Sequence, residues 1–394
     1  MTVVQGTVDT GFEAVRAAFE IAQANDEGAA QLCVYRHGRP VVDLWTGQDP
    51  ISGKPWDATS LVVLMSVSKG LTATCVHMLV ERGQLDLDAP VRDYWPEFAA
   101  NGKATITVAE VLSHRAGLSS FDPEYGIGPT QLTDWPTCVA ALESMTPLWQ
   151  PGTAFYYHSL TLGYLAGELI RRVTGKSVGD FLAAEVAGPL GLDLWIGLPE
   201  REEHRVVPQF TRQTGPTADQ VRAVLTQLGI DVEARLVRAS LATLATKDEG
   251  IEMLNTREGH AAEVPSGNGI GNARSLARMF AATIGEVDGI RLLSSATVDR
   301  ARQPQTLDLS SPPPLHVIPT THTFAYTYEV PSVTRPMLGA GSFGNVGTGG
   351  RIAFAHPESG VAVGYTCTNM TGDNTAAPDP RWVPWTAALQ EALT

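Results

Sequence analysis

The 394-residue sequence has few cysteines and histidines, and this scarcity excludes several classes of protein. Its four cysteines, Cys33, Cys75, Cys138 and Cys367, are far apart, and each falls in a segment whose pattern predicts a helix or a strand. We therefore expect reduced core residues in a cytoplasmic protein, with neither a disulfide framework nor a metal site. The nine histidines show no spacing typical of metal ligands, and we expect no metal and no cofactor.

Positive charge and long apolar runs are also scarce. The 28 Lys and Arg residues are outnumbered by 42 Asp and Glu residues, and the net charge of −14 leaves no basic face for a phosphate backbone. Nucleic acid is therefore not expected as a partner. No stretch has the length and apolar character of a membrane span, and residues 1–6 lack the basic and apolar regions of a secretory signal, so no membrane partner is expected either. The sequence carries no signature of an oligomeric state.

What the sequence does contain is typical of a large globular protein. Hydrophobic residues make up 43% of the chain and charged residues 18%, and a chain of this length can bury one large core or form two domains. Runs rich in β-branched and aromatic residues predict strands toward both ends of the chain. These runs are residues 31–35, 40–45, 324–330, 351–356 and 361–367.

Helical periodicity predicts a helix near each end, residues 12–23 and 382–393, and several helices between the two groups of strands. This order favours an α+β fold, in which an antiparallel sheet built from both termini is flanked by helices and a mostly helical domain is inserted. The predicted division is a discontinuous α/β domain, residues 1–70 and 290–394, and a helical domain, residues 71–289.

Three segments between these elements have a weaker pattern. Residues 212–247 are polar and favour helix, and residues 310–314 predict a stiff extended linker. Residues 266–272 are dense in glycine, but no strand is predicted before them and no Lys-Ser/Thr pair follows. We therefore interpret them as a tight turn and not as a phosphate-binding loop.

The first candidate for catalysis is a Ser-x-x-Lys pair, Ser66 and Lys69, at the junction of the two predicted domains. Apolar residues recur at helical spacing up to Gly83, so the pair lies at the start of a predicted helix with one buried face. Residues three apart share a helix face, and a lysine buried there can lose enough basicity to activate a serine. The alternative is a solvated surface lysine with no such role.

A rival serine, Ser177, stands in Gly175-Lys176-Ser177-Val178-Gly179, which fits the Gly-x-Ser-x-Gly pattern of a nucleophile elbow. An elbow follows a strand, whereas this serine follows a predicted helix, residues 162–173. We therefore interpret the match as a turn that ends the helix.

Two more stretches are candidates for a role in catalysis. Residues 150–159 contain two tyrosines before a predicted helix, and a phenol oxygen in a cleft beside an ammonium can shuttle protons. The alternative, an aromatic pair that packs under a loop, is favoured by this stretch taken alone. Residues 343–350 are rich in glycine, which permits close approach to a ligand, and can supply one amide of an oxyanion hole beside that of Ser66.

Taken together, four ordered motifs resemble those of serine hydrolases related to class C β-lactamases, and in particular those of family VIII carboxylesterases. The matching stretches are Ser66-Val67-Ser68-Lys69, His114-Arg115-Ala116-Gly117-Leu118, Pro151-Gly152 with Phe155 and Tyr157, and Gly344-Asn345-Val346-Gly347 followed by Phe354-Ala355-His356-Pro357. The resemblance extends from Gly11 to Asn369. It implies a β-lactamase/transpeptidase-like fold with an active site at the domain junction.

The resemblance also implies a mechanism and a site. Ser66 would attack the carbonyl carbon, Lys69 and Tyr157 would carry the proton to the leaving alcohol, and water would cleave the acyl-enzyme. The backbone amides of Ser66 and Thr348 would form the oxyanion hole. Whether a neutral Lys69 or Tyr157 is the general base stays open.

The sequence departs from the β-lactamase pattern at two places. Asn345 replaces a cationic lysine, or the histidine of many relatives, and cannot form an ion pair with a substrate carboxylate. Ser159 replaces the asparagine of Tyr-x-Asn, which binds an acylamino side chain. Both changes favour a neutral ester. The remaining predicted pocket residues are Gly347, Trp149, Phe155, Phe121 and Trp135.

The sequence therefore predicts a cytoplasmic serine carboxylesterase that acts on a small-molecule ester. Acyl transfer and hydrolysis of amides or β-lactams at the same site are alternatives, because they differ in what enters or leaves the acyl-enzyme. A non-catalytic binding module of the same fold is an alternative from another class, since fold alone does not determine function.

Overall fold

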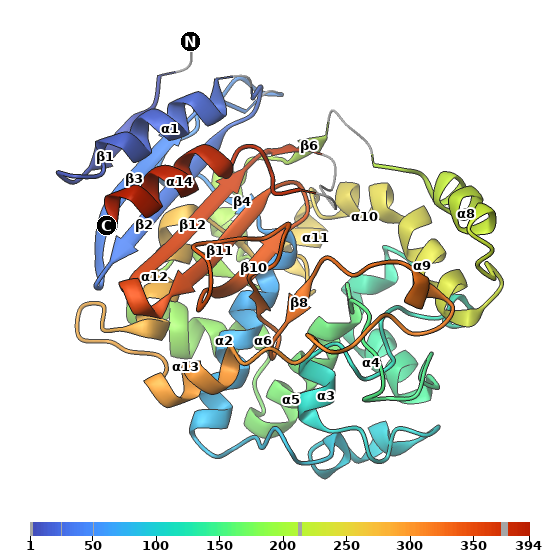
Figure 1. The fold of residues 1–394 in the computed structure, drawn as a ribbon. Helices are drawn as coiled ribbons and strands as arrows, with labels where there is room; N and C mark the ends of the chain where they lie inside the picture. Colours follow the sequence, from blue (N-terminus) through green and yellow to red (C-terminus); the bar gives the residue numbers. More distant parts are fainter. Residues whose placement is uncertain (1–2, 25, 50, 212–214, 372–376) are drawn as a thin grey trace.

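The computed structural model describes residues 3–24, 26–49, 51–211, 215–371 and 377–394. Residues 1–2 and 212–214, which belong to segments interpreted above, lie outside the described residues. An eight-stranded sheet in the order β1-β3-β2-β12-β11-β10-β9-β8 runs through the molecule, and all its neighbouring strands are antiparallel (Figure 1). The predicted α+β class, with an antiparallel sheet built from both termini, is confirmed.

Strands from the two ends of the chain meet in the middle of this sheet, where β2 pairs with β12. The strands are β1 (Gln5–Val8), β2 (Ala30–Arg36), β3 (Arg39–Thr46), β8 (Thr323–Phe324), β9 (Glu329–Val330), β10 (Phe343–Gly347), β11 (Arg351–His356) and β12 (Val361–Cys367). The sequence missed β1, and its single strand over residues 324–330 is two short strands in the structure, β8 and β9. Thr327, between them, has φ of 70°, which interrupts the extended backbone.

Helices cover both faces of the sheet. Helices α1 (Glu13–Gln23) and α14 (Val383–Ala392) lie side by side on one face (Figure 1). Helix α12 (Ala273–Ile284) packs on the other face, so it belongs to the sheet layers although it falls within the range of the predicted helical domain. A Cβ at Gly364 of β12 would lie 2.3 Å from the carbonyl oxygen of Ala273, which explains why this contact needs a glycine.

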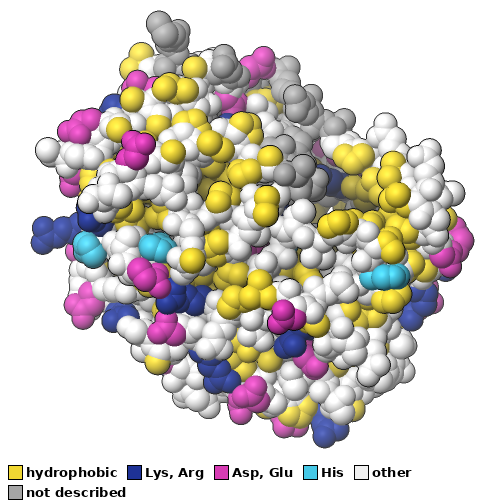
Figure 2. Space-filling view, viewed as in Figure 1, with side chains coloured by type: hydrophobic (Ala, Val, Ile, Leu, Met, Phe, Trp, Pro, Cys, Tyr) yellow, Lys and Arg dark blue, Asp and Glu magenta, His cyan; other side chains and the backbone are white. Residues whose placement is uncertain are grey.

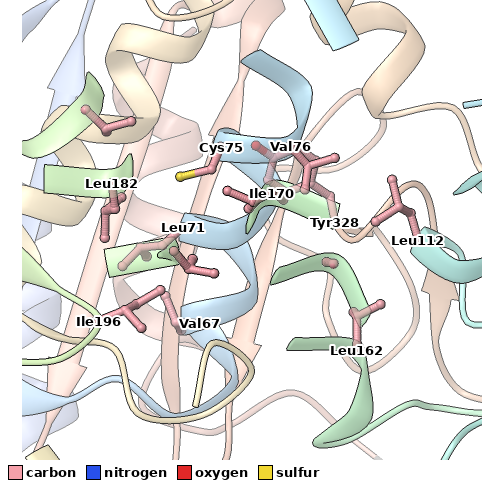
Figure 3. Packing of buried hydrophobic residues seen from close by; sticks show 14 of the residues in the cluster. Val67, Leu71, Cys75, Val76, Leu112, Leu162, Ile170, Leu182, Ile196 and Tyr328 are labelled. Atoms are coloured by element: carbon pink, nitrogen blue, oxygen red, sulfur yellow. The ribbon is translucent and has the colours of Figure 1, made fainter. Parts of the chain in front are cut away.

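Helix α2 (Ser68–Glu81) is the centre of the helical region, between α5 (Thr161–Thr174), α6 (Val178–Leu182) and the sheet strand β10. Its side chains are buried without interruption from Ser68 to Leu79, and Figure 3 shows Leu71, Cys75 and Val76 within the packed core. The prediction of a single buried face was therefore wrong, because α2 is covered by helices on one side and by the sheet on the other.

The other elements are smaller. Further helices are α3 (Val108–Leu112), α4 (Trp135–Ser144), α7 (Gly188–Leu190), α8 (Ala218–Gln227), α9 (Arg235–Ala245), α10 (Lys247–Met253), α11 (Arg257–Ala261) and α13 (Ser295–Ala301). Two small sheets are formed by β4 (Val62–Val63), β5 (Leu194–Trp195) and β7 (Ile270–Gly271), and by β6 (Phe210–Thr211) and β13 (Asn369–Met370). None of the helices in the described part of the chain has the length and apolar character needed to cross a lipid bilayer.

Helices α8, α9 and α10 form a separate lobe at one side of the molecule (Figure 1). Leu225 of α8 and Leu241 of α9 share a small apolar cluster with Leu315, just after the segment predicted as a linker. That segment also packs inward, because Ser311 is buried and the carbonyl oxygen of Ser310 accepts a hydrogen bond from the amide of Phe155. Residues 310–315 therefore form part of the wall beside this lobe.

Candidate active site

Ser66 lies in a short 3-10 turn (Met65–Val67) that leads directly into α2. The residue before it, Met65, has φ of 51°, a conformation that is unfavourable for a side chain with a Cβ and is often found at functional sites. Strand β10 passes so close to this turn that a Cβ at Gly347 would lie 2.5 Å from the carbonyl oxygen of Leu64. The turn thus presents Ser66 at the edge where the sheet meets the helical region.

Two polar groups, an amine and a phenol, converge on the hydroxyl of Ser66. The Nζ of Lys69 lies 3.3 Å from the Oγ of Ser66, as the three-residue spacing predicts. The hydroxyl of Tyr157, which is 91 positions further along the chain, donates a hydrogen bond to the same Oγ at 2.9 Å. Lys69 Nζ also lies 4.9 Å from the centre of the Tyr157 ring. A serine with an amine and a phenol in contact with its oxygen is an arrangement for nucleophilic catalysis.

Lys69 is held in a position where it can act as a base. Its Nζ donates hydrogen bonds to the carbonyl oxygens of Ser159 (2.7 Å) and Ser266 (3.0 Å). Burial lowers the pKa of Lys69 to about 7, although the negative charge of Glu329 acts in the opposite direction. A neutral amine has two N–H groups, which match the two carbonyls, and one lone pair, which remains for the Ser66 hydroxyl.

Two buried histidines hold the loop that carries Tyr157. The amide of His158 donates to Nδ1 of His114 (2.9 Å), and Nε2 of His158 accepts from the amide of Leu118 (3.2 Å). Burial lowers the pKa of His158 to about 4 and that of His114 well below its usual value, so both rings are neutral near pH 7. The ring of Phe324 stacks on that of Tyr157, with 5.6 Å between the ring centres. Sequence reasoning did not identify these supporting contacts. The signal that pointed toward them was the motif that begins at His114.

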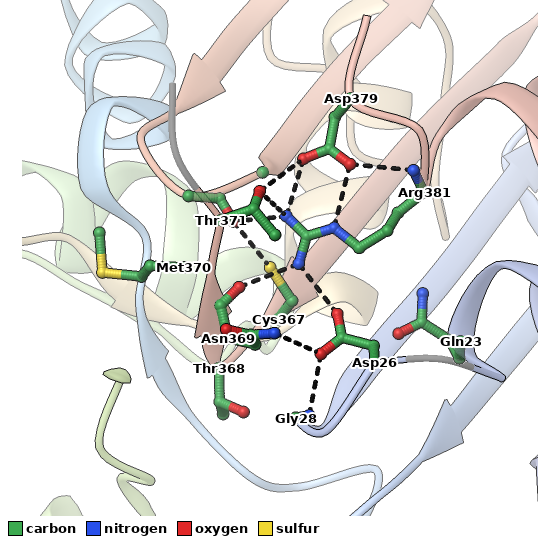
Figure 4. A network of polar contacts seen from close by, with 12 residues as sticks. Gln23, Asp26, Gly28, Cys367, Thr368, Asn369, Met370, Thr371, Asp379 and Arg381 are labelled. Atoms are coloured by element: carbon green, nitrogen blue, oxygen red, sulfur yellow. Dashed lines mark hydrogen bonds and ion pairs between the residues drawn. The ribbon is translucent and has the colours of Figure 1, made fainter. Parts of the chain in front are cut away.

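Thr348 follows directly after β10, at the turn that approaches Ser66. The buried Arg351 donates to the carbonyl oxygen of Thr348 (2.8 Å), which holds this peptide in place. Figure 4 shows a second buried arginine, Arg381, which pairs with Asp26 (3.1 Å) and Asp379 (2.7 Å). Its guanidinium also donates to the carbonyl oxygen of Gly349 (2.7 Å). The turn predicted to supply an oxyanion-hole amide is thus anchored by two arginines.

Two cavities meet at Ser66. The larger has a volume of about 640 Å³ and the smaller about 210 Å³, and Ser66, Tyr157, Ser159 and Thr348 line both of them. Of the other residues predicted for the pocket, Phe155 lines the larger cavity and Gly347 the smaller.

Four residues predicted for the pocket lie elsewhere among the described residues. Trp135 and Phe121 pack around the ring of Tyr164, and Trp149 packs edge-on behind His158 with its indole N–H on the carbonyl oxygen of Ala154. The structure places none of these three in the lining of either cavity. Aromatic composition alone did not distinguish core packing from a pocket wall, because both bury the same rings.

Asn345 is the fourth of these residues. It is 1% exposed, its amide donates to the carbonyl oxygen of Thr327 (2.9 Å), and among the described residues it lines neither cavity. Position 345 is therefore occupied by a buried structural amide. Among the charged groups beside Ser66 are Glu329 and Arg335, which line the smaller cavity with 2.9 Å between Oε2 and Nε.

The fold and this convergence of serine, lysine and tyrosine can now be compared with known proteins. The family model described as Beta-lactamase matches residues 16–383. The chain belongs to the beta-lactamase family. Its relative "Esterase/beta-lactamase LipL" of Mycobacterium tuberculosis (strain ATCC 25618 / H37Rv) is 34% identical over 372 residues, which are 91% of this chain and 81% of that protein.

Solved structures of this family agree with the match. A crystal structure of a family VIII carboxylesterase has a TM-score of 0.82 at 30% identity and covers 99% of this chain and 100% of that one. A penicillin-binding protein homologue from Caulobacter crescentus has a TM-score of 0.83 at 33% identity, with the same coverage. The protein is therefore a serine hydrolase of the beta-lactamase family with esterase homologues, and the predicted enzyme class is confirmed.

Proposed function

We propose that the protein is a carboxylesterase of the family VIII type, which hydrolyses neutral esters through an acyl-enzyme on Ser66. The observation that carries this proposal is the convergence of Lys69 Nζ and the Tyr157 hydroxyl on Ser66 Oγ, at 3.3 and 2.9 Å. The names of the relatives agree with it, because they include an esterase and a carboxylesterase.

Acylation begins with a proton transfer from Ser66 to the neutral amine of Lys69, and Oγ then bonds to the ester carbonyl carbon. The amides of Ser66 and Thr348 stabilise the negative oxygen of the tetrahedral intermediate. When the carbon–oxygen bond of the ester breaks, Tyr157 donates its proton to the leaving alcohol and recovers one from Lys69. The alternative general base is a Tyr157 phenolate next to a charged Lys69.

Deacylation repeats these steps with water. The same base removes a proton from the water as its oxygen adds to the acyl carbon, and the bond to Ser66 Oγ breaks. Oγ receives the proton, the carboxylic acid leaves, and the enzyme returns to its starting state. One ester and one water are thus converted into one acid and one alcohol.

The charges at the smaller cavity support a neutral substrate. Arg335 is paired with Glu329, and Asp379 is paired with Arg381, so the two carboxylates among the described residues that line this cavity each have a cationic partner. A substrate carboxylate would have to compete with an existing partner for Arg335. Hydrolysis of β-lactams is the second candidate function, and the name of the relative, Esterase/beta-lactamase LipL, favours it.

We also propose a cytoplasmic location. Cys33, Cys75, Cys138 and Cys367 are all buried as free thiols. Burial raises the pKa of the Cys75 thiol to about 12, so it is protonated and inert. Four free thiols are typical of a reducing compartment.

The test uses intact-mass spectrometry and nitrophenolate release with p-nitrophenyl acetate. We expect an acetyl adduct on the wild type and a rate loss of about 10⁴-fold or more in Ser66→Ala, as is typical for loss of a nucleophile. Ser177→Ala is the matched control, because Ser177 caps α6 and is the serine of the rival motif. Equal turnover by Ser66→Ala, or an adduct that Ser66→Ala retains, would overturn the proposal.

A further inference from the structure

The larger cavity extends from Ser66 into the lobe of α8, α9 and α10. Its walls include Val221 and Leu225 of α8, Val237 and Leu241 of α9, and Leu254 just after α10. Another part of the wall comes from the segment between Ser311 and Phe324. Figure 2 shows hydrophobic side chains gathered on this side of the molecule, between α10 and α8. A large part of this cavity wall thus belongs to a lobe that contributes neither Ser66 nor Lys69 nor Tyr157.

The chemistry of these walls differs from that of the smaller cavity. No Asp, Glu or Arg is found among the described residues that line the larger cavity, and Lys247 is its one lysine there. His322 lines both cavities, and burial lowers its pKa to about 3, so the ring is neutral at physiological pH. The smaller cavity, in contrast, is lined by Glu329, Arg335 and Asp379. An apolar group is therefore favoured in the larger cavity, where its surface is removed from water without the desolvation of any carboxylate or guanidinium in the described lining.

The volume of the larger cavity also exceeds what a short ester needs. At about 640 Å³ it lies within the range of about 300–1,000 Å³ that holds drug-sized ligands. An acetyl group at Ser66 would leave most of its apolar wall in contact with water. Each methylene that reaches this wall improves binding about fourfold, which corresponds to about 0.8 kcal/mol per buried CH₂.

We propose that the larger cavity binds a bulky apolar arm of the ester, so that the substrates are esters of medium-chain or ring-containing acids or alcohols. This inference rests on the proposed function, since the arm is joined to the carbonyl that Ser66 attacks. Leu241 is the side chain that a test should change, because it is buried on α9 and lines the cavity one helical turn beyond Val237.

The experiment measures kcat/KM for two series of esters below their micelle concentrations. One series varies the acid, from p-nitrophenyl acetate to octanoate, and the other varies the alcohol of acetate esters, from ethyl to octyl. We expect kcat/KM to rise at least tenfold along one series, and the series that responds identifies the arm. In Leu241→Trp the value for the longest ester of that series should fall at least tenfold, while p-nitrophenyl acetate changes less than twofold.

The matched control is Ala245→Trp, which places the same side chain at an exposed position of α9 outside the described lining. It should leave both series unchanged. A kcat/KM that stays flat or falls along both series, or an equal loss for short and long esters in Leu241→Trp, would overturn the inference.

Binding of a ketone separates this inference from the proposed function. 2-Decanone has the apolar arm but no bond that water can cleave, and calorimetry measures its binding to Ser66→Ala, whatever the role of Ser66. We expect binding that is at least tenfold tighter than that of 2-butanone and that Leu241→Trp weakens. If no ester is hydrolysed but the ketone binds in this way, the proposed function fails and the apolar site stands. If the two ketones bind alike, the apolar site fails.

Discussion

The turn at Ser66 with helix α2 and the lobe of α8 to α10 form the two sides of one site, but they are built in different ways. Helix α2 is buried without interruption from Ser68 to Leu79, whereas Leu225 is the one buried residue of α8, and α10, which is described throughout, has none. The Ser66 side is held by hydrogen bonds between buried polar groups, and the lobe by a few apolar contacts. Individual hydrogen bonds thus fix the positions of the groups at Ser66, whereas the lobe only encloses an apolar space.

The two sides should therefore have different roles, bond formation on the Ser66 side and selection among esters on the side of the lobe. A bond-forming step requires atoms placed within a few tenths of an ångström, and buried hydrogen bonds supply that placement. An apolar arm requires only a dry surface of suitable size, which many different side chains can supply. Substitutions on the Ser66 side should therefore affect all esters alike, and substitutions that face the cavity from the lobe should affect long esters selectively.

Loss of the Lys69 amine should have the greatest effect on activity. Lys69→Met keeps the length of the side chain but removes the amine, so neither neutral Lys69 nor its charge is available to activate Ser66. We expect kcat/KM to fall about 10³- to 10⁴-fold for short and long esters alike, a range typical of loss of a general base. Lys176→Met, at an exposed lysine, is the control and should change little. A loss of kcat/KM confined to long esters would contradict the expectation that the Ser66 side acts on all esters alike.

The next prediction concerns the anchoring of the turn after β10. Arg381→Ala leaves Asp26 and Asp379 buried without their cation, and loss of one partner from a buried pair typically lowers the free energy of unfolding by about 3–5 kcal/mol. Urea denaturation measures this change. Arg222→Ala, which removes an exposed pair with Glu233 on the lobe, should lower it by less than about 1 kcal/mol. Similar losses in the two variants would show that the two sides are equally well anchored.

The pH dependence of kcat/KM decides which group is the base. With the pKa of Lys69 lowered by burial to about 7, the amine gains a proton as the pH falls. If neutral Lys69 is the base, kcat/KM falls about tenfold per pH unit well below the pKa, and by about fiftyfold between pH 7, where half of the amine is neutral, and pH 5. The profile should be the same for short and long esters. A flat profile through pH 7 would instead indicate that Lys69 remains charged and that Tyr157 is the base.

The smallest expected effect is that of Trp149→Ala. Because Trp149 packs behind His158 and is not among the described residues that line either cavity, the ratio of kcat/KM for octanoate to that for acetate should change less than twofold. Leu241→Trp should change the same ratio at least tenfold. A Trp149→Ala variant with an altered ratio would place this ring in the pocket after all, as the sequence predicted.

The sequence predicted the sheet well where each strand has its own local pattern. The hairpin of β2 and β3 and the pair of β11 and β12 follow from runs of apolar residues separated by turn residues. Strand β1 was missed because it is a short edge strand in which no residue is fully buried, so it lacks an apolar run. Its pairing with β3 depends on a contact about 40 residues away, which no local window contains.

Less of the site than of the sheet could be predicted from the sequence, and the success differed from residue to residue. The proximity of Ser66 and Lys69 follows from the geometry of one helical turn, which any such spacing produces. The position of Tyr157 beside them required the resemblance to a family, because a distance of 91 residues has no local signature. The burial of Asn345 was not foreseen either, since the face toward which a strand residue points depends on what covers the sheet.

The sequence alone was thus sufficient to predict the longer strands of the sheet, several helices and the pair on one turn, because hydrogen bonds and side-chain periodicity along a helix or a hairpin involve neighbours in the chain. Only the tertiary structure decided that Lys69 is buried enough to lower its pKa, that Tyr157 contacts Ser66, and that Leu241 rather than Trp149 faces the cavity. Burial depends on everything that packs around a residue. Distant segments supply most of that packing, and no local pattern records which of them will meet.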